Sequence, residues 1–114
     1  MQSVTKKQPI TRAQLLEFSQ KMFGGLVKAV VDIDQEIMLV DAELHADEEA
    51  KLLDQGSKQD VLWGINLYPE ETGDDFIEFD SMINVRPRQN NRSRSIESEE
   101  VRNKIQAIVK KLVI

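Results

Sequence analysis

The sequence predicts an α+β domain, in which a four-stranded, mainly antiparallel sheet carries the terminal helices on one face. Three observations support this fold class. Residues 26–44 and 61–86 are rich in β-branched or aromatic residues, and each stretch contains a turn. Residues 11–25 and 95–112 carry apolar side chains at helical spacing. A short helical pattern at 47–55 separates the two hairpins, so we expect the order α-β-β-α-β-β-α, with the arrangement of strands within the sheet left open.

The first helix is expected to begin after Thr11, because Thr11 and Gln14 form the T-x-x-Q pattern of a capping box. Its apolar side consists of Leu15, Phe18, Met22 and Phe23. Gly24 or Gly25 is expected to end it, since glycine readily takes the left-handed conformation that closes many helices. Residues 1–10 are polar at their start and are expected to form a flexible lead-in.

Two strands, at 26–33 and 36–44, are expected next, with Asp34 and Gln35 in the turn between them. Alternate residues of a strand point to opposite faces of the sheet. One face of the second strand is apolar, with Met38, Val40, Ala42 and Leu44. The other face begins with Ile37 and Leu39 and becomes polar at Asp41, Glu43 and His45.

The hairpin at 61–86 is expected to fill the core. In its first arm, Trp63, Ile65 and Leu67 share one face. In its second arm the apolar face holds Ile77, Phe79, Ile83 and Val85, with Ser81 as its polar member. Pro69 and Gly73 suit the connecting turn. The expected buried set is Val40, Trp63, Ile65, Phe79, Ile83, Ile105 and Ile108.

The two remaining helices have recognisable ends. Asp47 is expected to cap the short helix at 47–55, and Gly56 suits its exit. Ser95 or Ser98 is expected to cap the last helix. Lysines at 110 and 111 suit the C-terminal end of that helix, where the helix dipole favours positive charge.

The composition favours a single cytoplasmic domain over 11–114. The chain has 114 residues, no cysteine and a formal net charge of -5. The lack of cysteine excludes disulfides and thiolate metal sites. No apolar run reaches the roughly 18 residues of a membrane helix, and the first residues lack the apolar core of a signal peptide. The acidic balance argues against a general coat for nucleic acids but allows a local basic patch.

Four strings of the sequence carry a resemblance to a known family. They are ELHADEEAKLLDQGS, DVLWGINLYPE, FIEFDSMINVRP and NRSRSIES. Together they resemble a family of short prokaryotic proteins that is known only as a domain of unknown function. The resemblance extends from about the first helix to the last. It implies no established activity, so no functional residues can be transferred from it.

One candidate site is a metal centre on the polar face of the sheet. Asp41, Glu43 and His45 would share a face of one strand, and Glu78 and Asp80 would share a face of another. Carboxylates with one imidazole can bind a divalent metal, which can acidify water for hydrolysis. The alternative is a solvated face of an antiparallel sheet, which has the same pattern.

The second candidate site is a basic stretch in an otherwise acidic chain. Its candidate anion-binding residues are Arg86, Arg88, Asn90, Asn91, Arg92 and Arg94. Arginine suits bidentate binding of phosphate or carboxylate, and the stretch leads into the start of a helix, where free N–H groups also attract anions. The alternative is a mobile surface loop whose arginines pair with Glu97, Glu99 and Glu100, or with the acidic turn of the preceding hairpin.

These features leave three hypotheses for the function. The first is a non-catalytic binding module that recognises an anionic ligand, carried by a nucleotide, an RNA or an acidic protein. The second is a metal-dependent hydrolase, with a divalent metal as its cofactor. The third is a structural or interaction subunit that acts through its sheet face. Under any of the three, we expect a monomer or homodimer and no membrane partner. No catalytic residue is assigned, because the chain has no G-x-S-x-G motif, P-loop or G-x-G-x-x-G motif.

Overall fold

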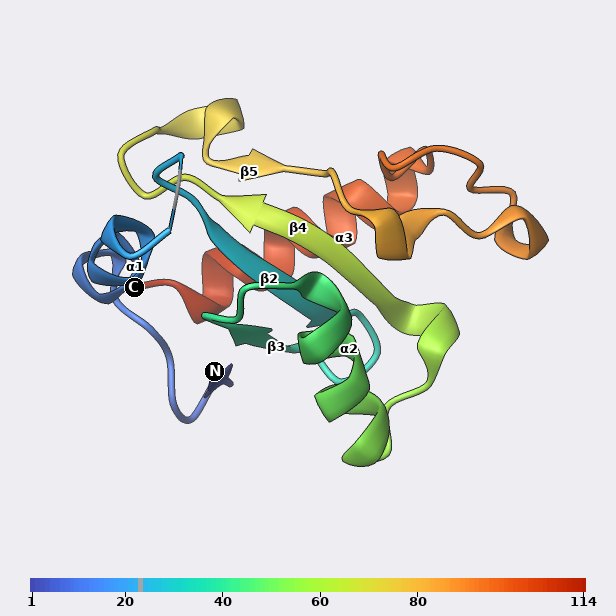
Figure 1. Ribbon diagram of the computed structural model, residues 1–114, viewed down its shortest axis with the longest axis horizontal. Coiled ribbons are helices and arrows are strands. Elements are labelled where there is room, and N and C mark those ends of the chain that lie inside the picture. Colours follow the sequence, from blue (N-terminus) through green and yellow to red (C-terminus); the bar gives the residue numbers. More distant parts are fainter. Residues whose placement is uncertain (23) are drawn as a thin grey trace.

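The structure is a computed structural model that describes residues 1–22 and 24–114. Over these residues the chain forms three α-helices and one five-stranded antiparallel sheet (Figure 1). The helices are α1 (Arg12–Gln20), α2 (His45–Asp54) and α3 (Glu99–Leu112). The strands are β1 (Gln2–Val4), β2 (Val27–Asp32), β3 (Ile37–Val40), β4 (Leu62–Leu67) and β5 (Ile77–Glu78). The α+β prediction is therefore confirmed, whereas the predicted number of strands is wrong.

The sheet has the order β1-β3-β2-β4-β5. The additional strand, β1, comes from the segment that was expected to be a lead-in, and it pairs with β3. Strands β2 and β4 pair over their full length, from Val27 opposite Leu67 to Asp32 opposite Leu62. The sequence pattern missed β1 because three residues of mixed polarity give no alternation to detect.

Apolar layers lie on both faces of the sheet. In Figure 1, α3 crosses behind the sheet and α2 lies in front of it. Leu15 of α1 and Ile105 of α3 belong to the same large buried cluster, which also contains Trp63 and Ile65. A smaller cluster on the opposite face contains Leu52 of α2. The terminal helices thus share one face, and α2 covers the other.

Most of the expected core is confirmed. Val40, Trp63, Ile65, Ile105 and Ile108 are buried in the large cluster, and Phe79 packs against it while partly buried. Ile83 is the exception, because it packs against the smaller cluster on the opposite face. The reason is that the second arm of the predicted hairpin leaves the sheet after Glu78 and forms a 3-10 turn at Met82–Asn84.

Beyond the short pairing with β5, a side chain takes the place of a backbone partner beside β4. Asn84 is fully buried, and its Oδ1 accepts a hydrogen bond from the amide of Gly64 at 2.8 Å. Its Nδ2 donates to the carbonyl oxygens of Gly64, at 2.9 Å, and of Arg94, at 3.0 Å. Asn84 thereby satisfies the edge of β4 as a backbone partner would.

The helix caps agree with the sequence in two of three cases. The capping box of α1 is present, with Thr11 and Gln14 each accepting from the other's backbone amide. Ser98, one of the two predicted residues, caps α3. The prediction for α2 is wrong, because this helix begins at His45 rather than at Asp47, and its cap residue Leu44 supplies no side-chain hydrogen bond.

A glycine follows the end of α2 as predicted, whereas α1 ends before the glycines that were expected to end it. Gly56 follows α2 with φ of 103°, as expected. Helix α1 ends at Gln20, before Gly24 and Gly25, although both of these glycines have positive φ. Phe23, which was assigned to the apolar side of α1, lies outside the described residues.

The segment before α1 pairs with the last residues of the sequence. Ile10 and Val113 form an isolated parallel bridge. The amide of Ile10 donates to the carbonyl of Leu112, and the amide of Ile114 donates to the carbonyl of Ile10, both at 2.9 Å. Within the described part of the chain, no helix combines the length and the apolar character needed to cross a bilayer.

Candidate functional site

Arg86, the first arginine of the basic stretch, is built into the fold. Its side chain is 10% exposed and forms an ion pair with Glu49 at 3.6 Å. Its Nε donates to the carbonyl of Ile83 at 3.0 Å, and a terminal nitrogen donates to the carbonyl of Leu62. Burial lowers the pKa of Arg86, and the carboxylate of Glu49 opposes this effect. Because Arg86 is committed to these partners, it is not available to an external anion.

Asparagine side chains shape the loop that follows. Asn90 has φ of 60°, a left-handed conformation that asparagine adopts more readily than most residues. Asn91 is buried, and its Nδ2 donates to the carbonyls of Asn84 and Ser95 at 2.7 Å and of Ser93 at 3.1 Å. The loop is therefore closed on itself by a side-chain amide.

The carboxylate of Glu97 already accepts hydrogen bonds from the basic loop. Oε2 of Glu97 accepts from the amides of Arg92, at 2.7 Å, and Ser93, at 2.9 Å. It also accepts from the hydroxyl of Ser93 at 3.0 Å. These hydrogen bonds hold the pKa of Glu97 below its usual value. Glu97 thus occupies two backbone N–H groups of the basic loop, which lie before the helix start where anion binding was expected.

The other arginines differ in their surroundings. Arg94 forms an ion pair with Asp80, with Nε and Oδ1 2.8 Å apart. Arg88 and Arg92 are exposed and form no ion pair with any residue that the structure describes.

The carboxylates of the predicted metal centre do not share a strand with His45. The strand β3 ends at Val40, and Asp41 has φ of 67°, which breaks the alternation on which that prediction depended. Glu43 is exposed, and Glu78 accepts hydrogen bonds from Asn66 and Tyr68. Among the described residues, no group of three or more His, Cys, Asp or Glu side chains could hold a metal ion.

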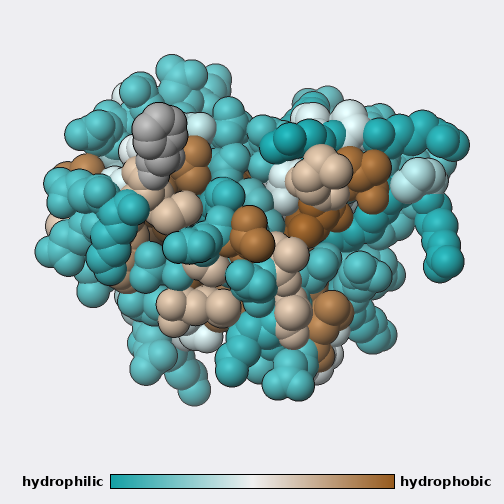
Figure 2. Space-filling model, viewed as in Figure 1, coloured by the Kyte–Doolittle hydropathy of each residue, from teal (hydrophilic) through white to brown (hydrophobic). Residues whose placement is uncertain are grey.

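The structure instead brings members of both predicted sites into one cavity, which we call the His45 pocket. Its volume is about 340 Å³, and it lies between the start of α2, β4 and the chain after β5. Its polar lining includes His45, Asn66, Asp80 and Arg94, and its apolar lining consists of Leu26, Leu44, Met82 and Ile83. Figure 2 views this side of the molecule and shows hydrophobic side chains among hydrophilic ones between α2 and the chain after β5.

His45 has a defined tautomer in this pocket. Its Nε2 lies 2.8 Å from the carbonyl oxygen of Ile65. A carbonyl oxygen only accepts hydrogen bonds, so Nε2 carries the hydrogen and Nδ1 carries the lone pair. Burial lowers the pKa of His45, and the Ile65 carbonyl and Asp80 oppose that effect. The imidazole is therefore neutral at neutral pH and presents Nδ1 as an acceptor.

In the described part of the chain, the amide oxygen of the Asn66 side chain lacks a hydrogen-bond donor. The residue is 6% exposed. Its Nδ2 donates to Oε1 of Glu78 at 2.8 Å and to the carbonyl of Asp80 at 3.1 Å. These two acceptors fix the orientation of the amide, because its oxygen could not take the same place. Oδ1 is buried and has no hydrogen-bond partner among the described residues.

The start of α2 is the third polar feature of the His45 pocket. Leu44 precedes the helix without a side-chain cap, and both His45 and Ala46 line the cavity. The first N–H groups of a helix have no partner within the helix and carry partial positive charge. An uncapped helix start beside a cavity can therefore interact with negative charge in it.

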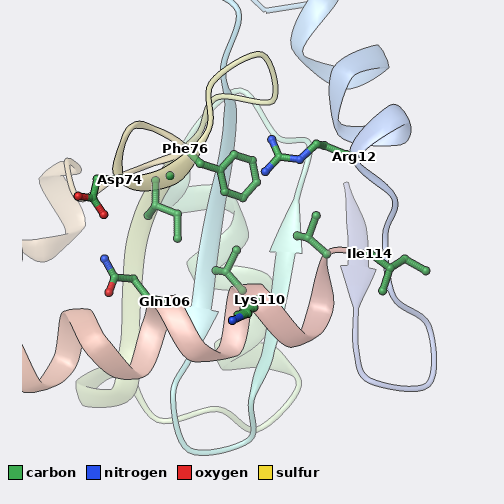
Figure 3. A pocket seen from close by; sticks show the side chains of 10 residues that line it. Arg12, Asp74, Phe76, Gln106, Lys110 and Ile114 are labelled. Atoms are coloured by element: carbon green, nitrogen blue, oxygen red, sulfur yellow. The ribbon is translucent and has the colours of Figure 1, made fainter.

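A larger cavity, of about 780 Å³, lies between α3 and the chain around Phe76 (Figure 3). The guanidinium group of Arg12 lies over the Phe76 ring at 4.1 Å and donates to the carbonyls of Pro69 and Glu71. Among the described residues, the buried side-chain atoms without a hydrogen-bond partner belong to Glu48, Glu49, Trp63 and Asn66. None of these residues lines the larger cavity, so none of the described buried, unpartnered polar atoms belongs to its lining.

Sequence reasoning assigned His45, Asp80 and Arg94 to sites, but to two different ones. It did not assign Asn66, Leu44 or Met82 to a site. Asn66 had a signal in the sequence, because it is the polar residue within the otherwise apolar strand LWGINL. A buried polar side chain needs a partner, and this one lacks it at Oδ1.

Comparison with known proteins identifies a family but no activity. A family model described as a protein of unknown function (DUF5674) matches residues 4–112. No curated protein and no solved structure matches the chain. The family model covers nearly the whole sequence, in agreement with the resemblance noted from the sequence. The chain therefore belongs to the DUF5674 family, a domain of unknown function.

Proposed function

We propose that this domain is a non-catalytic binding module that holds a small anionic ligand in the His45 pocket. The observation that carries this proposal is that Arg94 and the uncapped start of α2 line the same cavity. A guanidinium group and free helix N–H groups are two independent sources of attraction for a carboxylate or phosphate. The pocket volume of about 340 Å³ is within the range of small-molecule sites.

The ion pair between Arg94 and Asp80 does not prevent this role. The two side chains are 57% and 42% exposed. Exposed ion pairs contribute about 0–1 kcal/mol to stability, because water screens the charges and both side chains lose freedom. A ligand that gains several contacts in the pocket can therefore recruit Arg94 at little cost.

The wider hypothesis, in which the whole basic stretch binds a nucleotide or RNA, receives less support from the geometry. Arg86 is committed to Glu49 and backbone carbonyls, and Glu97 occupies the amides of Arg92 and Ser93. A phosphate-bearing ligand would have to gain its contacts from Arg94 and the exposed Arg88 and Arg92 side chains. A nucleotide therefore belongs among the ligands tested.

The test is an NMR titration of the full chain with inorganic phosphate, acetate and a nucleoside monophosphate. We expect shifts of the Ala46 amide and the Arg94 Nε–H signal, with weaker binding at about 200 mM than at about 50 mM salt. Arg94→Ala should weaken binding severalfold, whereas the control Arg88→Ala should not, because Arg88 lines a different cavity. Absence of shifts at the start of α2, or equal effects of the two variants, would exclude the proposal.

A further inference from the structure

One side of the His45 pocket contains hydrogen-bond acceptors that lack a donor. Nδ1 of His45 carries a lone pair, because Nε2 is fixed on the Ile65 carbonyl. Oδ1 of Asn66 is buried without a partner, and the Asn66 side chain lies close enough to the imidazole to raise its pKa. Of these two acceptors, Oδ1 of Asn66 is the buried one without a partner, and an unsatisfied buried polar group costs about 1–3 kcal/mol.

Opposite charges lie beside these acceptors. Asp80 lines the same cavity, and its carboxylate raises the pKa of His45, whereas burial and the positive charge of Lys28 lower it. The ammonium group of Lys28 donates to the carbonyl oxygen of Glu43 at 2.8 Å. The acceptor side of the pocket therefore matches a group that donates several hydrogen bonds, and Asp80 supplies a carboxylate that can pair with a positively charged one.

The other parts of the pocket attract different chemistry. Arg94 and the uncapped start of α2 attract an anion, as argued above. Leu44 and Met82 line the pocket and are exposed large hydrophobic residues, at 56% and 66% exposure. Burying such side chains against an apolar group is favourable by about 25 cal/mol per Å² of area removed from water.

We propose that the ligand of the His45 pocket is a free α-amino acid with an apolar side chain. Its ammonium group would donate to Nδ1 of His45, Oδ1 of Asn66 and the carboxylate of Asp80. Its carboxylate would bind Arg94 and the N–H groups at the start of α2, and its side chain would cover Leu44 and Met82. This inference rests on the proposed function, because the carboxylate occupies the anion site described there.

The experiment compares three ligands of the same shape by calorimetry and NMR with the full chain. Leucine has both charges, 4-methylpentanoate lacks the ammonium group, and leucinamide lacks the carboxylate. We expect leucine to bind about tenfold more tightly than either analogue, a difference of about 1.4 kcal/mol. Equal affinity for leucine and 4-methylpentanoate would refute the ammonium site while leaving the anion site intact.

Other outcomes are equally decisive. Equal affinity for leucine and leucinamide would mean that the pocket reads an amino terminus, as on a peptide, and would overturn the assignment of a free amino acid. No binding of leucine would also overturn it, whereas the proposed function would then stand or fall on the phosphate and acetate titrations.

A matched pair of variants tests the role of Asp80. Asp80→Asn retains the shape of the side chain and the backbone carbonyl that holds Asn66. It should reduce the affinity for leucine roughly fivefold and leave that for 4-methylpentanoate unchanged or higher, because only the ammonium group contacts Asp80. Asp74→Asn, which changes an exposed carboxylate in the larger cavity, is the control. Equal loss for leucine and 4-methylpentanoate would contradict the proposed contact.

Discussion

The guanidinium group of Arg86 lies over the indole ring of Trp63, with its carbon 4.7 Å from the ring centre. This contact joins the loop after β5 to the main core, because Trp63 belongs to the large buried cluster. The ion pair with Glu49 connects the same guanidinium group to α2. One arginine therefore links the loop, the sheet and a helix.

Replacing Arg86 is expected to destabilise the fold. Arg86→Ala removes the contact with Trp63, leaves Glu49 without its ion-pair partner and leaves two backbone carbonyls without their donor. We expect the free energy of unfolding to fall by about 3 kcal/mol, measured by urea denaturation. Arg88→Ala, at an exposed position of the same loop, should change it by less than about 0.5 kcal/mol. Similar losses for both variants would show that Arg86 has no special structural role.

Gly64 and Ser81 are expected to be coupled by their close approach. A Cβ atom at Gly64 would lie 2.6 Å from Cβ and 2.7 Å from Oγ of Ser81. Gly64→Ala should therefore cost about 1–3 kcal/mol through overpacking. Ser81→Gly creates the missing space, so the double variant should be more stable than the sum of the single effects by at least about 1 kcal/mol. Simple additivity in denaturation measurements would argue against this contact.

Glu48 is expected to make stability depend on pH. It is fully buried, and burial raises its pKa to about 9, while Ala42 donates a hydrogen bond to its Oε2. The unfolded chain releases this proton at a much lower pH, near the usual value of about 4.3. The folded state therefore binds more protons between these two pKa values, and the free energy of unfolding falls as the pH rises through this interval.

Glu48→Gln tests this dependence, because glutamine has the same shape and remains neutral. The variant should match the parent chain near about pH 4 and have a Tm several degrees higher near about pH 8. Glu17→Gln, on an exposed part of α1, is the control. A parent and variant that respond identically to pH would show that Glu48 does not titrate in this way.

Asn91 is expected to be required for the shape of the basic loop. Its side chain donates to three carbonyl oxygens and accepts from the amide of Glu97 at 2.8 Å. Asn91→Ala should cost about 3 kcal/mol, since each net hydrogen bond contributes about 1 kcal/mol. It should also increase the rate of trypsin cleavage within the loop. Asn103→Ala, on the exposed side of α3, should change neither measurement.

The fold was predictable where a pattern was long and regular. The alternation in β4 and the helical spacing in α3 placed Trp63, Ile65 and Ile105 correctly in the large cluster. The same alternation misled beyond Glu78, because Phe79, Ser81 and Ile83 continue the pattern while the backbone turns away. The Oγ of Ser81 accepts from the amide of Ile83, a local contact that competes with strand pairing.

The candidate site was predictable only in its parts. His45, Asp80 and Arg94 were identified by their chemistry. That they line one cavity depends on where β3 ends and on how the chain folds after β5. Counting arginines also overestimated the free positive charge of the loop, since Glu49 pairs with Arg86 and Asp80 pairs with Arg94. Such pairings join residues far apart in the sequence and leave no local pattern.

The bridge between Ile10 and Val113 has a consequence for how the chain folds during synthesis. The hydrogen bonds around this bridge join Ile10 to residues 112 and 114, so a nascent chain cannot complete them until that part has been made. Until then, the core face that α3 covers lacks Ile105, Ile108 and Leu112. Contacts between distant residues form slowly because closing a long loop costs entropy. The sheet face that α3 covers therefore stays without its apolar cover until these residues are available to pack.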